Sequence, residues 1–283
     1  RKAAVSRTGK SASHSTKSTM PNLLTLFLNE CRRTTSLWWN YRLSMFSSIL
    51  VHLVIFPVLM FLFQHLATRY GSSYGPGRQL DSLLGFLSWY LCMKVMIAIP
   101  RMVDDEATMG TLENVILAPV SLATTVVLRT VVYCFRYGLE TLLLGIVLSL
   151  TLGLYMPLTA EAAIIVLLTL AGTCGIGLAL AGLALVHKAM GSVVGVIGNL
   201  ALLFSGALVP LEGVGELFVL LKYGFPMTWG ISILRRLAIS HALLFPSDVM
   251  GLAIQTVMML VVGGFVFFAW LQKAKMQGLL AAY

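Results

Sequence analysis

The sequence predicts an all-α polytopic membrane protein. Of its 283 residues, 58% are hydrophobic and only 11% are charged, and the mean hydropathy is +0.88. Apolar runs of about 20 residues recur along the chain, which is the length that an α-helix needs to cross about 30 Å of hydrocarbon. The runs are continuously apolar and do not alternate within segments of about ten residues, so they argue against a transmembrane β-barrel.

The charged residues indicate a lipid partner rather than a nucleic acid. The formal net charge is +9, and the Lys and Arg residues lie mostly beside the apolar runs, where they would meet anionic headgroups. We therefore expect membrane lipids as partners and no nucleic acid. Four isolated cysteines form neither a CxxC pair nor a disulfide framework, and we expect them to be packing residues.

The N-terminal segment, residues 1–19, is predicted to be a disordered basic leader or a segment that is not native to the protein. It lacks the apolar core of a signal peptide. Residues 4–11, AVSRTGKS, fit the loose spelling of a phosphate-binding loop. Such a loop works only between a buried strand and a helix, and neither flank is predicted, so we expect no nucleotide site here.

Residues 20–43 predict an amphipathic helix that lies along the membrane surface. Leu24, Phe27 and Leu28 fall near one face, whereas Arg32 and Arg33 occupy another. The alternative is a soluble amphipathic helix that packs on the rest of the protein.

Six transmembrane helices are predicted within a domain that covers residues 44–272, followed by a cytosolic tail, residues 273–283. An even number of spans places both termini on one side of the membrane. The predicted spans are residues 44–67, 82–101, 125–153, 161–186, 190–209 and 249–271.

The distribution of basic residues orients these spans. Outside the leader and at or beyond the ends of the spans, the side that holds the termini carries seven Lys or Arg residues and the other side carries five. Because cytosolic loops are enriched in Lys and Arg, we expect both termini to be cytosolic. The seven are Arg32, Arg33, Arg42, Arg101, Lys188, Lys273 and Lys275, and the five are Arg69, Arg78, Lys222, Arg235 and Arg236.

Residues 210–246 are too long for a simple loop and too often interrupted by Gly and Pro for a full span. This pattern predicts two short re-entrant helices, which persist at membrane depth only when they are buried in protein or line a wet cavity. An interfacial loop with short surface helices is the alternative.

Three motifs resemble those of one transporter family. EATMGTLENVILAPVS, residues 106–121, resembles the segment between the second and third spans of ABC-2 type permeases, the membrane subunits of ABC transporters that export drugs, lipids and polysaccharides. SGALVPLEG, residues 205–213, and FPMTWG, residues 225–230, resemble the end of the fifth span and the re-entrant region of that family. The match extends from residue 21 onward, although residues 214–217 lack the Pro before a Trp that members commonly have. The re-entrant residues that the resemblance marks are Gly206, Pro210, Pro226 and Trp229.

The resemblance implies the type V exporter fold. It also implies a cytosolic coupling helix within residues 102–121, and we call this whole range the coupling segment. In such permeases this segment docks on a separate ATP-binding cassette subunit, present in two copies, which binds ATP and Mg. The chain itself would hold no cofactor, and it would pair with a second permease copy, giving a homodimer. Alternatively, the acids only solvate a loop and cap a helix end. The residues assigned to coupling are Glu106, Gly110, Thr111, Leu112, Glu113 and Pro119.

Three charged residues within the third span are unusual for a membrane helix. Arg129, Arg136 and Glu140 fall on one helical face, and we expect Arg136 and Glu140 to pair across one turn. Arg129 lies nearer the cytosol, from which its side chain could reach the interface. This face either lines a translocation path or serves only structural pairing.

No catalytic or metal-binding constellation is predicted, because the histidines are scattered and no Ser, His and acid set converges on one face. The chain is therefore expected to transport rather than to catalyse. By its resemblance, it is expected in the bacterial cytoplasmic membrane as a multi-pass permease, exporting an amphipathic drug, antibiotic or lipid-like molecule and so contributing to multidrug or antibiotic resistance.

Three alternatives stay open at this point. Polysaccharide or lipid-linked glycan could be the substrate if Trp89, Tyr90 and Trp229 form stacking surfaces. An ion-coupled transporter or channel without an ATPase would use the charges within the spans as a gate. A membrane scaffold that recruits a cytosolic protein through the acidic segment is the third.

Overall fold

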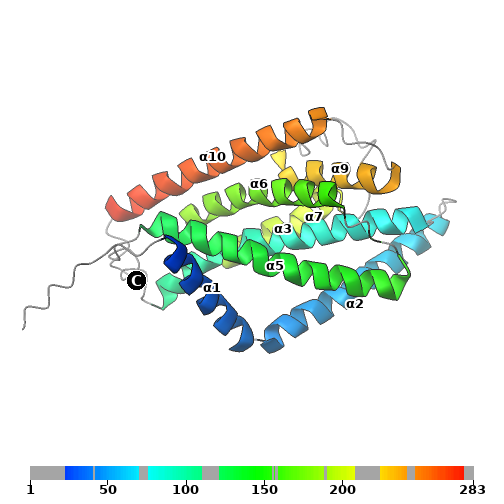
Figure 1. Cartoon of the computed structure of the whole chain (residues 1–283), viewed down its shortest axis with the longest axis horizontal. Helices are drawn as coiled ribbons and strands as arrows, with labels where there is room; N and C mark the ends of the chain where they lie inside the picture. Colours follow the sequence, from blue (N-terminus) through cyan, green and yellow to red (C-terminus); the bar gives the residue numbers. More distant parts are fainter. Residues whose placement is uncertain are drawn as a thin grey trace, which may run out of the picture.

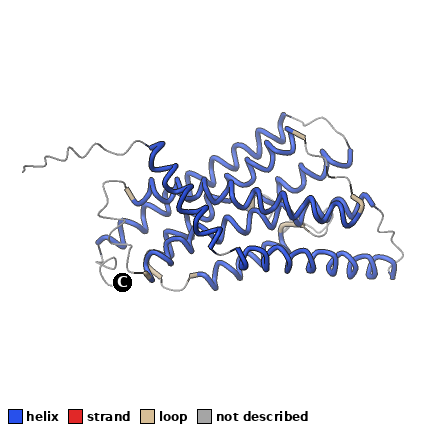
Figure 2. The backbone as a smooth tube through the Cα atoms, turned by 60° about the horizontal axis from the view of Figure 1, so that its bottom comes forward, coloured by secondary structure: helices blue, strands red, loops and turns tan. Residues whose placement is uncertain are grey.

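The fold is a bundle of α-helices, seen in a computed structural model that describes residues 23–40, 42–69, 76–109, 121–154, 156, 159–187, 190–207, 224–240 and 246–276. Figure 1 shows the longest helices running roughly side by side, with α1 crossing them at an angle. Figure 2 shows that helix makes up nearly all of the described backbone. The helices are α1 (Leu23–Asn40), α2 (Arg42–Arg69), α3 (Pro76–Thr108), α5 (Leu122–Leu152), α6 (Ala160–Ala184), α7 (Gly191–Phe204), α9 (Pro226–Ser240) and α10 (Pro246–Met276).

Four of these helices are long and apolar enough to cross a membrane, by length and composition. They lie at the predicted second, third, fourth and sixth spans, and they support a multi-pass integral membrane protein. The predicted first and fifth spans coincide with α2 and α7, whose described apolar stretches are shorter, Phe46–Leu62 and Ser192–Leu202. The six-span arrangement therefore stays a prediction.

Helix α3 is the centre of the bundle. It contacts α5, α6, α7 and α9, and its buried share is the largest among the candidate spans. Leu83, Phe86, Val95, Met96 and Ile99 along its length have no exposed surface. A movement of α3 would therefore change its contacts with most of the other helices.

Helices α6 and α10 pack most closely, because glycine lets their backbones meet. A Cβ atom on Gly263 of α10 would overlap the backbone of Gly175 in α6, and one on Gly175 would overlap the backbone of Met259. In a membrane, such close approach through small residues is a main source of helix association.

Helix α2 lies at the margin of the bundle and contacts the other helices sparsely (Figure 1). Its outward side presents large apolar side chains, among them Phe46, Leu50, Val54 and Phe61, each more than half exposed. Such a surface is suited to lipid or to another apolar protein surface.

The helix of the predicted second span is longer than the sequence pattern indicated. Instead of ending near Arg101, α3 continues to Thr108, so the first residues of the coupling segment extend this helix. Residues 110–120 lie outside the described part of the chain, as do residues 1–22, 208–223, 241–245 and 277–283. Of the predicted re-entrant region, α9 is the described part, and it packs against α3, α6 and α10.

Candidate functional site

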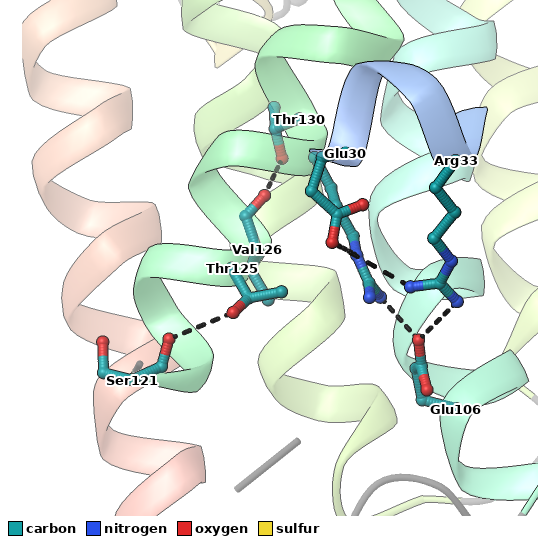
Figure 3. Close-up of polar contacts among 8 residues, drawn as sticks. Glu30, Arg33, Glu106, Ser121, Thr125, Val126 and Thr130 are labelled. Atoms are coloured by element: carbon teal, nitrogen blue, oxygen red, sulfur yellow. Dashed lines mark hydrogen bonds and ion pairs between the residues drawn. The ribbon is translucent and has the colours of Figure 1, made fainter. Parts of the chain in front are cut away.

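A cluster of four charged residues joins three helices near the end of α3, just before residues 110–120. Nη1 of Arg129, on α5, donates to Oε1 of Glu106, on α3, over 2.7 Å. Nη2 of Arg33, on α1, donates to the same oxygen over 3.0 Å. Nε of Arg129 donates to Oε1 of Glu30, also on α1, over 3.1 Å. Figure 3 shows Arg33 reaching from α1 to Glu106, with Glu30 beside Arg33.

The cluster is electrically balanced, since two glutamates face two arginines. Glu106 is 6% exposed and Arg129 is 7% exposed, so the central pair is removed from water. Burying either charge alone costs several kcal/mol, and good pairing geometry with further hydrogen bonds offsets that cost. Arg129, which was expected to reach the membrane interface, is instead buried against Glu106, and Glu106 is not one of the acids that solvate a loop.

The start of α5 is fixed by a helix cap directly after the undescribed residues 110–120. The Oγ atom of Ser121 accepts a hydrogen bond from the backbone N–H of Thr124 over 3.1 Å. The hydroxyl of Thr125 donates to the Ser121 carbonyl (Figure 3). This cap satisfies one of the backbone N–H groups that a helix start leaves without a partner. Both helices that flank residues 110–120 are thus anchored, α5 by its cap and both by the ionic cluster.

A second polar cluster lies near the middle of α3 and α5. Oε1 of Glu140 accepts a hydrogen bond from the Tyr90 hydroxyl over 2.5 Å and lies 3.6 Å from Nζ of Lys94. Lys94 also donates to the hydroxyl of Ser48 on α2 over 2.5 Å. Three helices therefore meet at these polar groups.

The expected pairing of Arg136 with Glu140 is wrong. Glu140 turns to Lys94 and Tyr90 of α3, which offer it an ammonium and a hydroxyl across the helix interface. The guanidinium of Arg136 lies over the ring of Tyr137, 5.3 Å from its centre. Nε of Arg136 is buried and has no hydrogen-bond partner among the described residues. Arg129, Arg136 and Glu140 share a face of α5, as predicted, but they belong to two separate clusters.

A third contact holds the region after α7 to the rest of the bundle. Nη2 of Arg235, on α9, donates to the carbonyl of Ala207 over 2.9 Å, and its Nε donates to the carbonyl of Asp81 over 3.2 Å. Gly206, directly before Ala207, has a φ of 71°, a conformation that glycine adopts without strain. The sequence analysis counted Arg235 only as an outward-side charge, and its position in an apolar stretch was the signal for a buried role.

The comparison with protein families decides what kind of protein carries these clusters. The family model described as ABC-2 type transporter matches residues 25–238, well over half of the chain. The chain belongs to the ABC-2 type transporter family. This confirms the resemblance carried by the three motifs. No curated protein matches the chain.

As a member of this family, the chain is the transport permease of an ABC transporter. In ABC transporters, ATP is bound by an ATP-binding cassette subunit. Of the residues assigned to coupling in this permease, Glu106 lies in the ionic cluster at the end of α3. Gly110, Thr111, Leu112, Glu113 and Pro119 lie outside the described residues, so their role stays a prediction.

Two of the predicted re-entrant residues pack against neighbouring helices. Pro226 begins α9 and lies against Gly172 of α6, where an added Cβ atom would come within 2.9 Å of it. A Cβ atom added at Gly251 of α10 would likewise come within 2.6 Å of the Trp229 ring. Pro210 lies outside the described residues. Within the described ranges, no three His, Cys, Asp or Glu side chains are placed to share a metal ion.

Proposed function

We propose that this permease is the membrane subunit of an ATP-driven exporter, powered by two copies of a separate ATP-binding subunit. The ionic cluster of Glu30, Arg33, Glu106 and Arg129 is the observation that carries the proposal. It binds α1, α3 and α5 together at the two ends of residues 110–120, the part of the chain where the family resemblance places the docking helix.

The cluster supports a mechanical role for the coupling segment. A displacement of residues 110–120 by a closing ATPase would act on the end of α3 and the start of α5. Because Glu106 holds Arg129 over 2.7 Å, these two helices would move as one unit, and α1 would follow through Glu30 and Arg33. Helix α3 contacts most of the bundle, so a tilt of α3 would change the packing around the transport path. Glu106 on this view orients the segment from inside the permease.

An amphipathic drug, antibiotic or lipid-like molecule is the substrate class that we favour. A cavity of about 530 Å³ lies among α3, α5, α6 and α9, within the size range of small-molecule sites, and its lining is mostly apolar. Ser88, Thr141 and Thr159 contribute the few hydroxyl groups in that lining.

A glycan substrate is less well supported by the aromatic residues that suggested it. Tyr90 is 1% exposed and is engaged with Glu140, whereas Trp89 is 8% exposed and donates through Nε1 to the carbonyl of Gly198. Trp229 packs on Gly251. The rings of Trp89 and Tyr90 are thus buried in helix packing, whereas that of Trp229 is partly exposed.

We further propose that the permease works as a homodimer in the bacterial cytoplasmic membrane with both termini in the cytosol. The apolar outward side of α2 offers a surface that a second copy or lipid can cover. The excess of basic residues on the side of the termini supports the orientation.

Reconstitution with the ATP-binding subunit tests the proposal. Transport of an amphipathic dye into proteoliposomes should require ATP, and Glu106→Gln should lower ATP-driven transport at least several-fold while the ATPase still co-purifies. Glu161→Gln is the control, because Glu161 is an exposed acid outside the coupling segment and its loss should leave transport unchanged. Dye movement or ion conduction by the permease without any ATPase would instead favour the ion-coupled alternative.

A further inference from the structure

The arginine near the middle of α5 has no counter-charge among the described residues. Arg136 lies about 21 Å along the helix from Leu122 and about 24 Å from Leu152, at a rise of about 1.5 Å per residue. An arginine side chain is too short to reach either membrane surface from that depth. No ion pair joins Arg136 to another described side chain, and its buried Nε has no hydrogen-bond partner there.

The neighbouring charges do not neutralise Arg136. The single carboxylate of this cluster, Glu140, is 4% exposed and is already engaged by Lys94 and Tyr90. The ring of Tyr137 is near both cations, with its centre 5.3 Å from the Arg136 guanidinium and 6.0 Å from Nζ of Lys94. Lys94, Glu140 and Arg136 together therefore carry one excess positive charge at mid-span. Such a charge costs about 2.5–3.5 kcal/mol or more in hydrocarbon unless a partner balances it.

The side of α5 next to Arg136 is suited to an apolar chain. Phe135 is 72% exposed and Leu139 is 46% exposed, so large apolar side chains border the guanidinium on the outward side of the helix. A ligand that places an anionic group at Arg136 would therefore lay an apolar part along this surface.

A second basic residue of α3, Arg101, lies just before the coupling segment. Arg101 is exposed and lies seven residues after Lys94, which is about two turns along the same face of α3. Arg101 and Lys94 thus place two positive charges on one face of α3, one at the end nearer the coupling segment and one near mid-span.

We propose that Arg136, assisted by Lys94, binds the phosphate or carboxylate group of an anionic amphiphile whose apolar chain lies against α5. This proposal rests on the export function proposed above, and it assigns the charge of the substrate. Guanidinium donates two parallel hydrogen bonds to phosphate or carboxylate, which explains why arginine rather than a second lysine suits this position. Two sources share this chemistry, a transported amphiphile and a resident anionic lipid.

Binding in phosphatidylcholine nanodiscs tests the site without the ATPase. Fluorescent phosphatidylglycerol should bind the purified permease about tenfold more tightly than phosphatidylcholine with the same label and chains. Both lipids carry a phosphate, but the choline cation of phosphatidylcholine cancels its net charge and would be repelled by Arg136 and Lys94, a difference of about 1.4 kcal/mol. Arg136→Gln should abolish the preference and Arg136→Lys should restore part of it. The control Arg32→Gln removes an exposed cation of α1 and should leave the preference intact. A preference that survives Arg136→Gln in a folded, monodisperse protein would overturn the proposal.

A second arm separates the two sources. In proteoliposomes that also hold the ATP-binding subunit, ATP-dependent movement of the labelled phosphatidylglycerol between leaflets, lost in Arg136→Gln, would identify a transported amphiphile. Arg136-dependent binding without ATP-dependent movement of that lipid would support the same site with a resident lipid as its ligand. If no amphiphile moves with ATP while this binding persists, the export function fails and the anion site stands.

Discussion

Nη1 of Arg129 lies 2.7 Å from Oε1 of Glu106, and both side chains are more than nine-tenths buried. The two residues lie on α5 and α3, on either side of residues 110–120. Their contact makes the end of one span and the start of the next a single mechanical unit, on which the proposed transmission of ATPase movement depends.

The Glu106–Arg129 pair should stabilise the permease measurably. Arg129→Gln should lower the free energy of unfolding by about 3–5 kcal/mol, because it removes the more buried of the two arginines that contact the buried Glu106. Unfolding in mixed micelles would give this value. In a double-mutant cycle with Glu106→Gln, the double variant should lose less than the sum of the two single losses. Additive losses would mean that the two side chains do not interact.

The two neighbouring arginines of α9 should behave differently. Arg235 donates to the carbonyls of Asp81 and Ala207, whereas Arg236 forms a 2.9 Å ion pair with Asp248 with its side chain 46% exposed. Arg235→Gln should therefore cost about 2–4 kcal/mol, and Arg236→Gln about 1 kcal/mol or less. Thermal unfolding in detergent would compare them. Equal shifts of the melting temperature would contradict the buried role of Arg235.

The two adjacent glycines of α10 offer an equally close comparison. A side chain at Gly263 would meet the backbone of Gly175, whereas one at Gly264 would find open space. Gly263→Leu should separate α6 from α10 and sharply reduce the yield of monodisperse protein, while Gly264→Leu should be tolerated. Size-exclusion chromatography would measure both. A well-folded Gly263→Leu variant would show that the α6–α10 packing is looser than described.

The cap at the start of α5 should contribute a smaller amount. Ser121→Ala removes the acceptor of the Thr124 N–H and should cost about 1 kcal/mol, whereas Ser121→Asp should retain the cap. Thermal unfolding of the two variants gives the difference. If Ser121→Asp destabilised as much as Ser121→Ala, the hydrogen bond would not be the cause.

The helices could be predicted from the sequence because apolar runs of membrane length have few alternative structures. Helix ends were harder to predict: α3 continues past Arg101 because Glu106, an acid that pattern analysis assigns to water, is neutralised by Arg129 and Arg33. Those partners lie 23 and 73 residues away in sequence, beyond the reach of local patterns.

The same limit explains the error at Arg136 and Glu140. Spacing within one helix shows which side chains share a face, but it does not show what the facing helix offers. Here Lys94 and Tyr90 of α3 contact Glu140, so Glu140 pairs across the helix interface instead of with Arg136 on its own helix. The alignment of the three charges along α5 was predictable, whereas their division between two clusters was not.

We propose that a separate ATPase drives this permease through the coupling segment. The direct measurement is transport of an amphipathic dye in proteoliposomes that contain the permease and the ATP-binding subunit, with Glu113→Arg compared with the native chain. Our account predicts transport only when both subunits and ATP are present, and loss of ATPase co-purification and of transport in the variant. Transport by the permease alone, or by the variant at the native rate, would contradict it.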